Sequence, residues 1–267
     1  MKSYLSYFKL KFITGLQYRS AALAGIFTQL FFGFIYVSVY IACYESSSTN
    51  LPMPLNELVS FLWLNQAFFF LIYLWYKDND IIKLIKTGNL SYELCRPQDL
   101  YFMWFSKIFG EKLSGALLRF LPVILIAVLL PSPFNLDLSI TLPRLLIFII
   151  AFSLSSILTV SIILLYHVIC LITLDEKGIV NIFMVLSDIL SGLVLPIPFF
   201  PNVLQKISNF LPYRYVSDFP FRLYVGNISL QEGIKGIIIQ IIWIIILILI
   251  GKLITKKALK KVVIQGG

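Results

Sequence analysis

The sequence predicts an all-α integral membrane protein, and three observations lead to this fold class. Of the 267 residues, 59% are hydrophobic and only 13% are charged, whereas a soluble domain carries about a quarter charged residues. The mean hydropathy is +0.89. Six apolar runs approach or exceed the roughly twenty residues with which a helix crosses a bilayer. No linker, charged tract or internal repeat divides the chain, so residues 1–267 are expected to form a single membrane domain.

The expected transmembrane helices differ in length. They cover residues 21–43, 58–76, 113–130, 145–174, 180–195 and 236–254. The fourth exceeds the usual hydrocarbon thickness, so it is expected to tilt or to protrude. The fifth is short and ends in the sequence LPIPFFP, in which the prolines remove helix donors. Because lipid cannot satisfy irregular backbone, we expect residues 196–227 to form an outer re-entrant or interfacial segment buried against protein. The prolines that mark this segment are Pro196, Pro198, Pro201 and Pro212.

Lysine and arginine residues are distributed unevenly between the two sides of the expected bundle. Sixteen of the 22 lie on the side of both termini, in residues 1–20, in residues 76–112, in the short connection before span five and in the C-terminal tail. Five lie on the opposite side: Arg144, Lys206, Arg214, Arg222 and Lys235. Positively charged loops stay in the cytoplasm, so both termini are predicted to be cytoplasmic. Topology and contact with anionic membrane lipids account for the net charge of +9, and no nucleic-acid partner is expected.

Residues 1–20 predict an interfacial helix rather than a cleaved signal peptide, because they lack a compact apolar core and a small-residue cleavage site. Leu5, Phe8, Phe12 and Leu16 recur at helical spacing. This stripe indicates an amphipathic helix that lies along the membrane surface before span one. A plain cytoplasmic extension of span one is the alternative.

The connection between spans two and three, residues 77–112, contains a short helical pattern. The sequence DND at 78–80 offers N-cap side chains, residues 81–86 form one to two amphipathic turns, and Gly88 suits the helix end. The sequence NLSYELCRP then predicts a second short element that Pro97 ends. A short helix parallel to the membrane, with basic residues and turns at its ends, is expected to dock on lipid headgroups or on a soluble partner.

Motifs for chemistry are absent from the sequence. It contains no GxxxxGK[ST] pattern, so no phosphate cradle for ATP is expected in this chain. The single histidine, His167, lies three residues before Cys170, and two ligands are too few for a metal site. Helix packing is the simpler role for His167. We predict no catalytic residues, no metal and no cofactor bound by this chain, and we interpret its three cysteines as free thiols.

Two ionisable residues fall inside expected spans. Arg119 lies in span three and Asp188 in span five, where a charge is costly unless it is paired or faces water. Both are therefore candidates to line a translocation path. The alternatives are a structural ion pair or, for Arg119, a side chain that extends to the membrane surface.

Two stretches resemble a known family, the transmembrane permeases of bacterial type-2 ABC exporters, in particular the six-span branch. The first is IKTGNLSYELCRPQDLYF, which has a basic residue near a glycine and then Leu-x-Arg-Pro. The second is LSGLVLPIPFFPNVLQKISNFLPYRYVSDFPFRLYVGNIS, with Ser-Gly, a proline-rich bend, a short amphipathic helix, Leu-Pro and a closing glycine. With the interfacial helix and the span count, the resemblance covers nearly the whole chain.

The resemblance implies a transport function in the bacterial inner membrane. Such permeases pair with a second copy or a paralogue, and each binds a separate cytoplasmic ABC ATPase subunit that holds ATP and magnesium. By this resemblance the loop after span two contains the coupling helix, which contacts the ATPase. The expected coupling residues are Asp80, Ile81, Lys83, Leu84, Lys86, Thr87, Gly88, Asn89, Leu90, Glu93, Arg96 and Pro97. The segment 196–227 resembles the outer re-entrant helices that cap the path.

Two other function classes remain open from the sequence. A secondary transporter driven by an ion gradient usually has inverted repeats and broken helices, and Asp188 is the only plausible proton site for one. A membrane protein with an assembly role instead of a transport role is the second alternative. The short connection Asp175-Glu176-Lys177-Gly178 leaves little room for a second contact with an ATPase.

Overall fold

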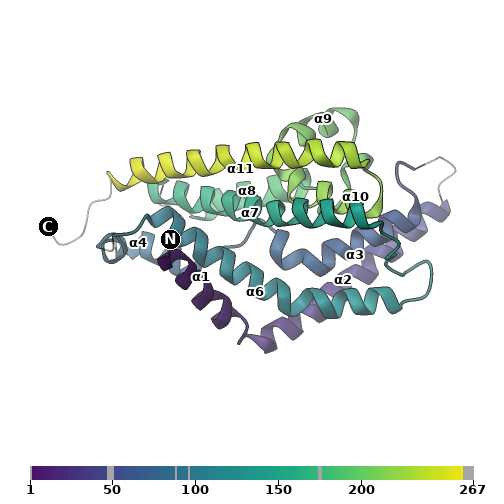
Figure 1. Cartoon of the computed structure of the whole chain (residues 1–267), viewed down its shortest axis with the longest axis horizontal. Coiled ribbons are helices and arrows are strands. Elements are labelled where there is room, and N and C mark those ends of the chain that lie inside the picture. Colours follow the sequence, from purple (N-terminus) through teal and green to yellow (C-terminus); the bar gives the residue numbers. More distant parts are fainter. Residues whose placement is uncertain (1, 47–50, 88, 96, 174–175, 261–267) are drawn as a thin grey trace.

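The computed structural model describes residues 2–46, 51–87, 89–95, 97–173 and 176–260. Within them, five helices are long and apolar enough to cross a membrane. They are α2 (Arg19–Ser46), α3 (Leu55–Ile72), α6 (Leu100–Leu129), α7 (Leu142–Thr173) and α11 (Leu230–Leu259). They run side by side along the long axis of the molecule (Figure 1). The expected all-helical membrane architecture is therefore present in the part that the structure describes.

The sixth expected span corresponds to α8 (Glu176–Leu190), which has 15 residues. At about 1.5 Å per residue this helix extends about 22 Å, less than the roughly 30 Å of a hydrocarbon core. It runs back along α7 from the end where α7 stops (Figure 1). A total of six spans, with α8 as the short one, therefore stays a prediction.

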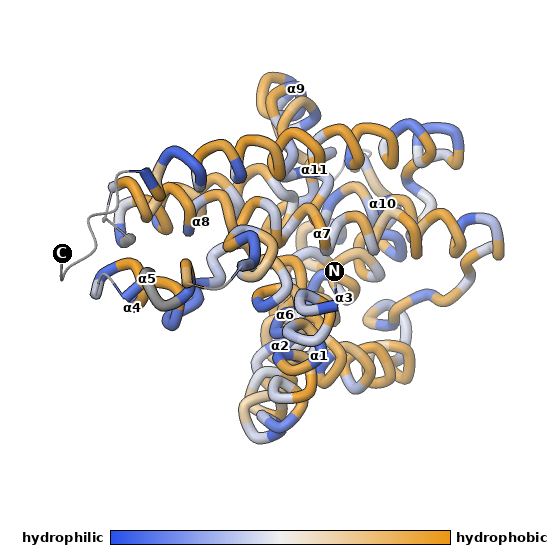
Figure 2. The backbone as a smooth tube through the Cα atoms, turned by 60° about the vertical axis from the view of Figure 1, so that its left-hand side comes forward, coloured by the Kyte–Doolittle hydropathy of each residue, from blue (hydrophilic) through white to orange (hydrophobic). Residues whose placement is uncertain are grey.

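Helices α3 and α7 form the centre of the bundle. In α3 67% and in α7 56% of the most apolar window is buried, compared with 22% in α2 and in α11. Helix α7 packs against α11, α3 and α6, and α3 packs against α2 and α6. The outer helices direct their remaining apolar side chains away from the protein, as expected for a surface in contact with lipid, and Figure 2 shows hydrophobic residues along most of each long helix.

The chain begins with α1 (Lys2–Gly15), which is a separate helix and not a continuous extension of α2. It packs along the first half of α6, and the rings of Phe8 and Phe109 are 5.6 Å apart. Gly110 allows this close approach, because a Cβ atom there would lie 2.8 Å from the Phe8 carbonyl oxygen. Leu5 and Leu10 stay exposed. An orientation of α1 along the membrane surface, as predicted from the sequence, would cover them with lipid.

Helix α3 ends earlier than the sequence predicts. The apolar run continues to Tyr76, but the helix stops at Ile72 and Tyr73 is extended. The reason lies in α6, where the ammonium group of Lys112 donates hydrogen bonds to the carbonyl oxygens of Phe70 (3.0 Å) and Tyr73 (2.6 Å). Lys112 thus binds carbonyl groups that a helix end leaves without partners.

Two short helices, α4 (Asn79–Thr87) and α5 (Leu90–Leu94), follow α3. They lie at the end of the molecule where α11 finishes, whereas α10 (Asp218–Val225) lies towards the opposite end (Figure 1). A short α4 was predicted at this place. Helix α6 then begins as a new helix. Its N-cap is Asp99, whose side chain accepts a hydrogen bond from the backbone N–H of Phe102 (3.2 Å).

The proline-rich segment after α8 consists of short elements. They are η1 (Ile197–Phe199), α9 (Asn202–Phe210), η2 (Pro212–Tyr215) and α10. Pro196 and Pro201 cap the starts of η1 and α9, Pro198 lies in η1 and Pro212 starts η2. Helix α9 projects from the bundle beside α11 in both views (Figures 1 and 2). The prolines therefore mark the element boundaries, as predicted.

Polar side chains from the long helices satisfy the irregular backbone of this segment. The amide of Gln240 donates hydrogen bonds to the carbonyl oxygens of Ala151 and Tyr215, both at 3.0 Å. The hydroxyl of Ser155 donates to the carbonyl oxygen of Val216. Arg144 donates to Leu223 and Ile228, each at 3.1 Å. Irregular backbone at membrane depth needs such partners, and here the bundle itself provides them.

Candidate functional site

Helix α4 begins at an aspartate that the sequence marked as a possible cap. The Oδ1 atom of Asp78 accepts hydrogen bonds from the backbone N–H groups of Asp80 and Ile81, both at 3.0 Å. This is N-capping, which satisfies donors that have no partner within the helix. The cap that the sequence predicted is therefore present at the start of α4.

The two faces of α4 have different roles. Ile81, Ile82 and Ile85 are buried, and α4 packs on α7. Asp80, Lys83, Lys86 and Thr87 are exposed on the other face. An apolar stripe holds a short amphipathic helix on the protein. The polar face is exposed, where it could contact a ligand surface or a partner.

An ion pair that is largely buried joins α4 to α6. The ammonium group of Lys107 lies 2.7 Å from Oδ1 of Asp78 and 2.8 Å from Oδ2 of Asp80. The side chains of Lys107 and Asp78 are 5% and 3% exposed, so each charge depends on the other for compensation. Removing one partner of such a pair costs about 3–5 kcal/mol. Lys107 thus fixes the first turn of α4 to a transmembrane helix.

The same turn is also joined to α7. The backbone N–H of Asp78 donates a hydrogen bond of 3.1 Å to Nε2 of His167, which is fully buried. Because Nε2 accepts this bond, Nδ1 carries the proton of the neutral ring and donates to the carbonyl oxygen of Ile163 at 2.8 Å. Both ring nitrogens are engaged, so His167 is not available as a metal ligand. Its packing role is confirmed, and its partner is α4.

Lys107 also changes the acidity of Asp80. Its hydrogen bond and its positive charge hold the pKa of the Asp80 carboxyl below the ordinary value for aspartate, against a smaller opposite effect of burial. Asp80 is 74% exposed, so water screens part of this interaction. The carboxylate therefore stays charged at neutral pH and keeps the lysine between two anions.

The loop that leads from α3 to α4 is held to α6 by further contacts. The Lys112 ammonium lies 3.5 Å from the centre of the Tyr73 ring, a cation–π contact, in addition to its bonds to backbone carbonyls. The Tyr76 hydroxyl donates a 2.5 Å hydrogen bond to Oε2 of Glu111. The connection between α3 and α4 is thus fixed along its length and not only at its ends.

The structure places the predicted coupling residues on two neighbouring helices. Asp80, Ile81, Lys83, Leu84, Lys86 and Thr87 lie in α4, Leu90 and Glu93 lie in α5, Asn89 lies between them, and Pro97 follows α5. Gly88 and Arg96 lie outside the described residues. Ile81 and Leu90 are buried, so they hold the two helices in place and do not form the outer surface.

Neither Lys107 nor His167 is among the residues predicted for this site. A lysine inside the apolar sequence YFMWFSKIF is a signal that could have pointed to Lys107. For His167 the only signal in the sequence is that it is the single histidine of the chain. Their partner Asp78 is 29 residues from Lys107 and 89 from His167, and sequence spacing gives no information over such separations.

Arg119 and Asp188, the candidates for a translocation path, are not brought together. Arg119 contacts α2, where it donates a 3.4 Å hydrogen bond to the Ala21 carbonyl oxygen, and lies 4.1 Å from the centre of the Phe70 ring. It lines a cavity of about 720 Å³ between α1, α2, α3, α6 and the start of α4. Asp188 is half-buried on α8, which packs on α7 and η2. No ion pair joins the two in the described part of the chain.

Within the described ranges no group of three or more His, Cys, Asp or Glu side chains is placed to hold a metal ion. Asp78 and Lys107 are engaged in the ion pair and the cap of α4, whereas Asp80, Glu111 and Arg119 line the cavity of about 720 Å³. This arrangement suits mechanical linkage between an exposed helix and the transmembrane bundle.

Comparison with known proteins gives the family. A family model described as ABC-2 family transporter protein matches residues 57–266, which include α4, the ion pair and the proline-rich segment. No curated protein matches the chain. Since the match extends over most of the sequence, the chain belongs to the ABC-2 family of transporter proteins, as the membrane component of an ABC transporter.

Proposed function

We propose that this chain is the transmembrane subunit of an ATP-driven exporter in a bacterial inner membrane, with both termini in the cytoplasm. In this proposal it pairs with a second copy or a paralogue to form the substrate path. A separate cytoplasmic ABC ATPase binds each permease and holds ATP and magnesium. Membership of the family supports a partnership with an ABC ATPase in general. The direction of transport, the pairing of two permeases and the membrane topology are further parts of the proposal.

The observation that carries the proposal is the way α4 is anchored. One face exposes Asp80, Lys83 and Thr87, while the first turn is bonded to α6 through Lys107 and to α7 through His167. A helix that only rested on lipid headgroups would need the basic face but not these two bonds. An element that receives a force at its surface and passes it to the bundle needs both.

The physical argument concerns two states of the bundle. An ATPase can shift the equilibrium between them only if its contact with the permease differs between the states. Because α4 is bonded to α6 and α7, a displacement of α4 acts directly on two long helices. Packed helices shift between discrete arrangements and do not deform continuously. We therefore assign the coupling role to α4, with α5 beside it.

We further propose that Arg119 and Asp188 line parts of the path, and that the segment 196–227 caps it on the outer side. The cavity beside Arg119 and the position of that segment away from α4 support these roles (Figure 1). The side chain of Asp188 makes no hydrogen bond or ion pair with the residues that the structure describes. A proton site there is the feature that an ion-driven carrier would need.

Affinity purification from native membranes tests the coupling role. A chain with Lys83→Glu and Thr87→Glu changes two exposed positions of α4 that are four residues apart. The matched control, Lys2→Glu with Ser6→Glu, makes the same changes at exposed positions of α1 with the same spacing. We expect a P-loop ATPase to copurify with the native chain and with the control, and to be lost from the α4 variant.

Two results would count against the proposal. If the native chain is correctly inserted and brings no ATPase, the exporter function fails, and gradient-driven transport through Asp188 becomes the next hypothesis to test. If the ATPase copurifies equally with the α4 variant, the partner binds elsewhere and α4 is not its docking element.

A further inference from the structure

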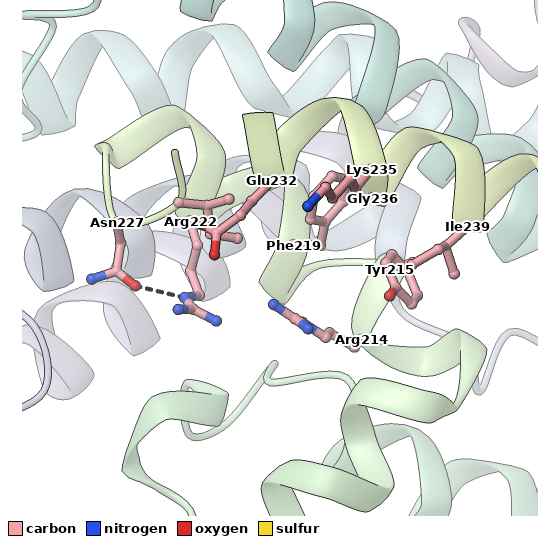
Figure 3. A pocket seen from close by; sticks show the side chains of 10 residues that line it. Arg214, Tyr215, Phe219, Arg222, Asn227, Glu232, Lys235, Gly236 and Ile239 are labelled. Carbon is pink, nitrogen blue, oxygen red and sulfur yellow. Dashed lines mark hydrogen bonds between the residues drawn. The ribbon is translucent and has the colours of Figure 1, made fainter. Parts of the chain in front are cut away.

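A second polar site lies towards the opposite end of the molecule from α4. It is a cavity of about 290 Å³ between η2, α10 and the first turns of α11 (Figure 3). Its floor is apolar and aromatic, with Tyr215, Phe219 and Ile239. Ile228 and Gly236 also line it, and its polar lining residues are Arg214, Arg222, Asn227, Glu232 and Lys235. The coupling role does not use this site, and the proposed cap of the path assigns no ligand to it.

Two arginines of the cavity share one carboxylate. The Nε atom of Arg214 lies 3.4 Å, and Nη1 of Arg222 lies 3.3 Å, from Oδ2 of Asp218. Asp218 is fully buried, and the two arginine side chains are 18% and 15% exposed. The other oxygen of Asp218 accepts a hydrogen bond from the backbone N–H of Ile197 at 3.0 Å. A single carboxylate neutralises one guanidinium group, so the charge of the second remains.

The other charges at the cavity do not remove this excess. Lys235 and Glu232 are both exposed at the start of α11 and offset each other in net charge. Glu232 is engaged in capping, since it accepts hydrogen bonds from the backbone N–H and the hydroxyl of Ser229. The lining residues together with Asp218 therefore carry about one positive unit at neutral pH, since carboxyl groups are ionised and lysine and arginine protonated there. A further carboxylate, Glu57, lies outside the lining and accepts a 3.3 Å hydrogen bond from the side chain of Asn227.

Hydrogen-bond donors remain for a ligand. Arg214 also donates through Nη1 to the Asn209 side-chain oxygen (2.6 Å), and Arg222 donates through Nε to that of Asn227 (2.8 Å). Among the described residues, neither Nη2 atom donates a hydrogen bond. Figure 3 shows both guanidinium groups directed into the same space. Asn209 and Asn227 thus each hold one of these guanidinium groups in place.

We propose that this cavity binds a phosphate group, and that the headgroup of a membrane phospholipid provides it. Guanidinium groups bind phosphate oxygens with two parallel hydrogen bonds, and two such groups directed into the same space with surplus positive charge suit such an anion. The aromatic floor beside them accommodates the carbon atoms attached to the phosphate. A free phosphate offers the same oxygen atoms, so the two sources differ in whether an attached lipid is required.

The distribution of basic residues supports a local role for these side chains. Arg214, Arg222 and Lys235 are three of the five basic residues on the expected outer side, where positive charge is disfavoured in membrane proteins. A fourth, Arg144, binds the carbonyl oxygens of Leu223 and Ile228 and so closes the turn beside the cavity. The proposal depends on the proposed topology only for the side of the membrane, because the cavity itself is independent of the ATPase.

Binding to the purified chain in dodecyl maltoside, a detergent without phosphate, tests the proposal. The probes are inorganic phosphate and short-chain phosphatidylglycerol, each measured by titration calorimetry. Arg222→Gln removes one guanidinium group and leaves Asp218 paired with Arg214. Arg214→Gln removes the other guanidinium group and leaves Asp218 paired with Arg222. It replaces the first variant in the experiment if Arg222→Gln does not fold. The matched control is Lys206→Gln, which removes an exposed positive charge of α9 outside the cavity.

We expect phosphatidylglycerol to bind the native chain and the Lys206→Gln control equally, and at least tenfold more weakly to either arginine variant. Inorganic phosphate is expected to bind much more weakly than the lipid. Tight binding of inorganic phosphate without binding of the lipid would overturn the lipid source. Equal lipid binding by folded arginine variants, or no binding of either probe to the native chain, would overturn the site. None of these results depends on whether an ATPase copurifies.

Discussion

The Nζ atom of Lys107 lies 2.7 Å from Oδ1 of Asp78, and this contact joins the start of an exposed short helix to the interior of a transmembrane helix. The same oxygen atom caps α4, and the backbone N–H of the same aspartate binds His167 of α7. Three helices therefore meet at one residue. The predictions below test what this junction does for stability and for coupling.

Replacing Lys107 by methionine should destabilise the protein by about 3–5 kcal/mol, because it leaves the buried Asp78 carboxylate without its cation. Unfolding in mixed micelles, followed by tryptophan fluorescence, measures the free energy. Adding Asp78→Asn should recover most of the loss, since asparagine still caps a helix and carries no charge. A double variant as unstable as the single one would show that the two side chains do not depend on each other.

Replacing His167 by leucine should increase hydrogen exchange at the first turn of α4, because the backbone N–H of Asp78 loses its acceptor. A buried donor left without a partner costs about 1–3 kcal/mol. Exchange detected by mass spectrometry should rise in the peptide around residues 76–82. Ile163→Val, a smaller change at a buried position of the same helix, should leave that peptide unchanged. Equal exchange in both variants would argue against the link between α4 and α7.

The pH dependence of stability should reveal the contact between Asp80 and Lys107. The pKa of Asp80 is lowered in the folded state, first by the Lys107 hydrogen bond and next by its charge. A lowered pKa of a carboxyl group stabilises the fold above the unfolded-state pKa, about 3.9 for aspartate. The stabilisation is lost as the pH falls through the lower folded-state pKa.

Asp80→Asn should therefore lower the unfolding temperature at pH 6–7, and its difference from the native chain should shrink below a pH of about 4. Glu45→Gln, at an exposed position of α2, should show little difference at any pH. A difference for Asp80→Asn that stays constant from neutral to acidic pH would mean that its charge is not involved.

Replacing Gln240 by leucine should loosen the proline-rich segment. The Gln240 amide donates hydrogen bonds to Ala151 and to Tyr215, so the variant leaves two carbonyl oxygens without this donor. We expect a loss of about 1–3 kcal/mol and faster limited proteolysis within residues 196–217. The neighbouring exposed position provides the control, Ile241→Leu. Unchanged proteolysis of the Gln240 variant would show that other contacts hold the segment.

Local signals predicted much of this fold. The DND sequence predicted the start of α4, because an aspartate caps its own following turn. The prolines at 196 and 201 predicted element boundaries, since a ring without an N–H fits the start of a helix. Length and hydropathy identified the long helices, whose most apolar windows of 18 residues contain at most two charged residues.

Long-range partners account for what the sequence did not predict. The end of α3 depends on Lys112, which binds the Phe70 carbonyl 42 residues away in the chain. The apolar run beyond Ile72 gives no sign of it. The ion pair of Lys107 and the bond to His167 likewise form only when α4, α6 and α7 are packed together. A single sequence records the side chains but not which helices meet.

Site-specific photo-crosslinking tests the central claim, that α4 is the docking element for the ATPase, most directly. A photoreactive amino acid replaces Lys83 on the exposed face of α4 in one chain, and Lys2 on α1 in another. Both are expressed in native membranes and irradiated, and the crosslinked partners are identified by mass spectrometry. The account predicts a crosslink from position 83 to a P-loop ATPase and none from position 2. Crosslinks from position 83 to lipid alone, in membranes where the ATPase is present, would contradict it.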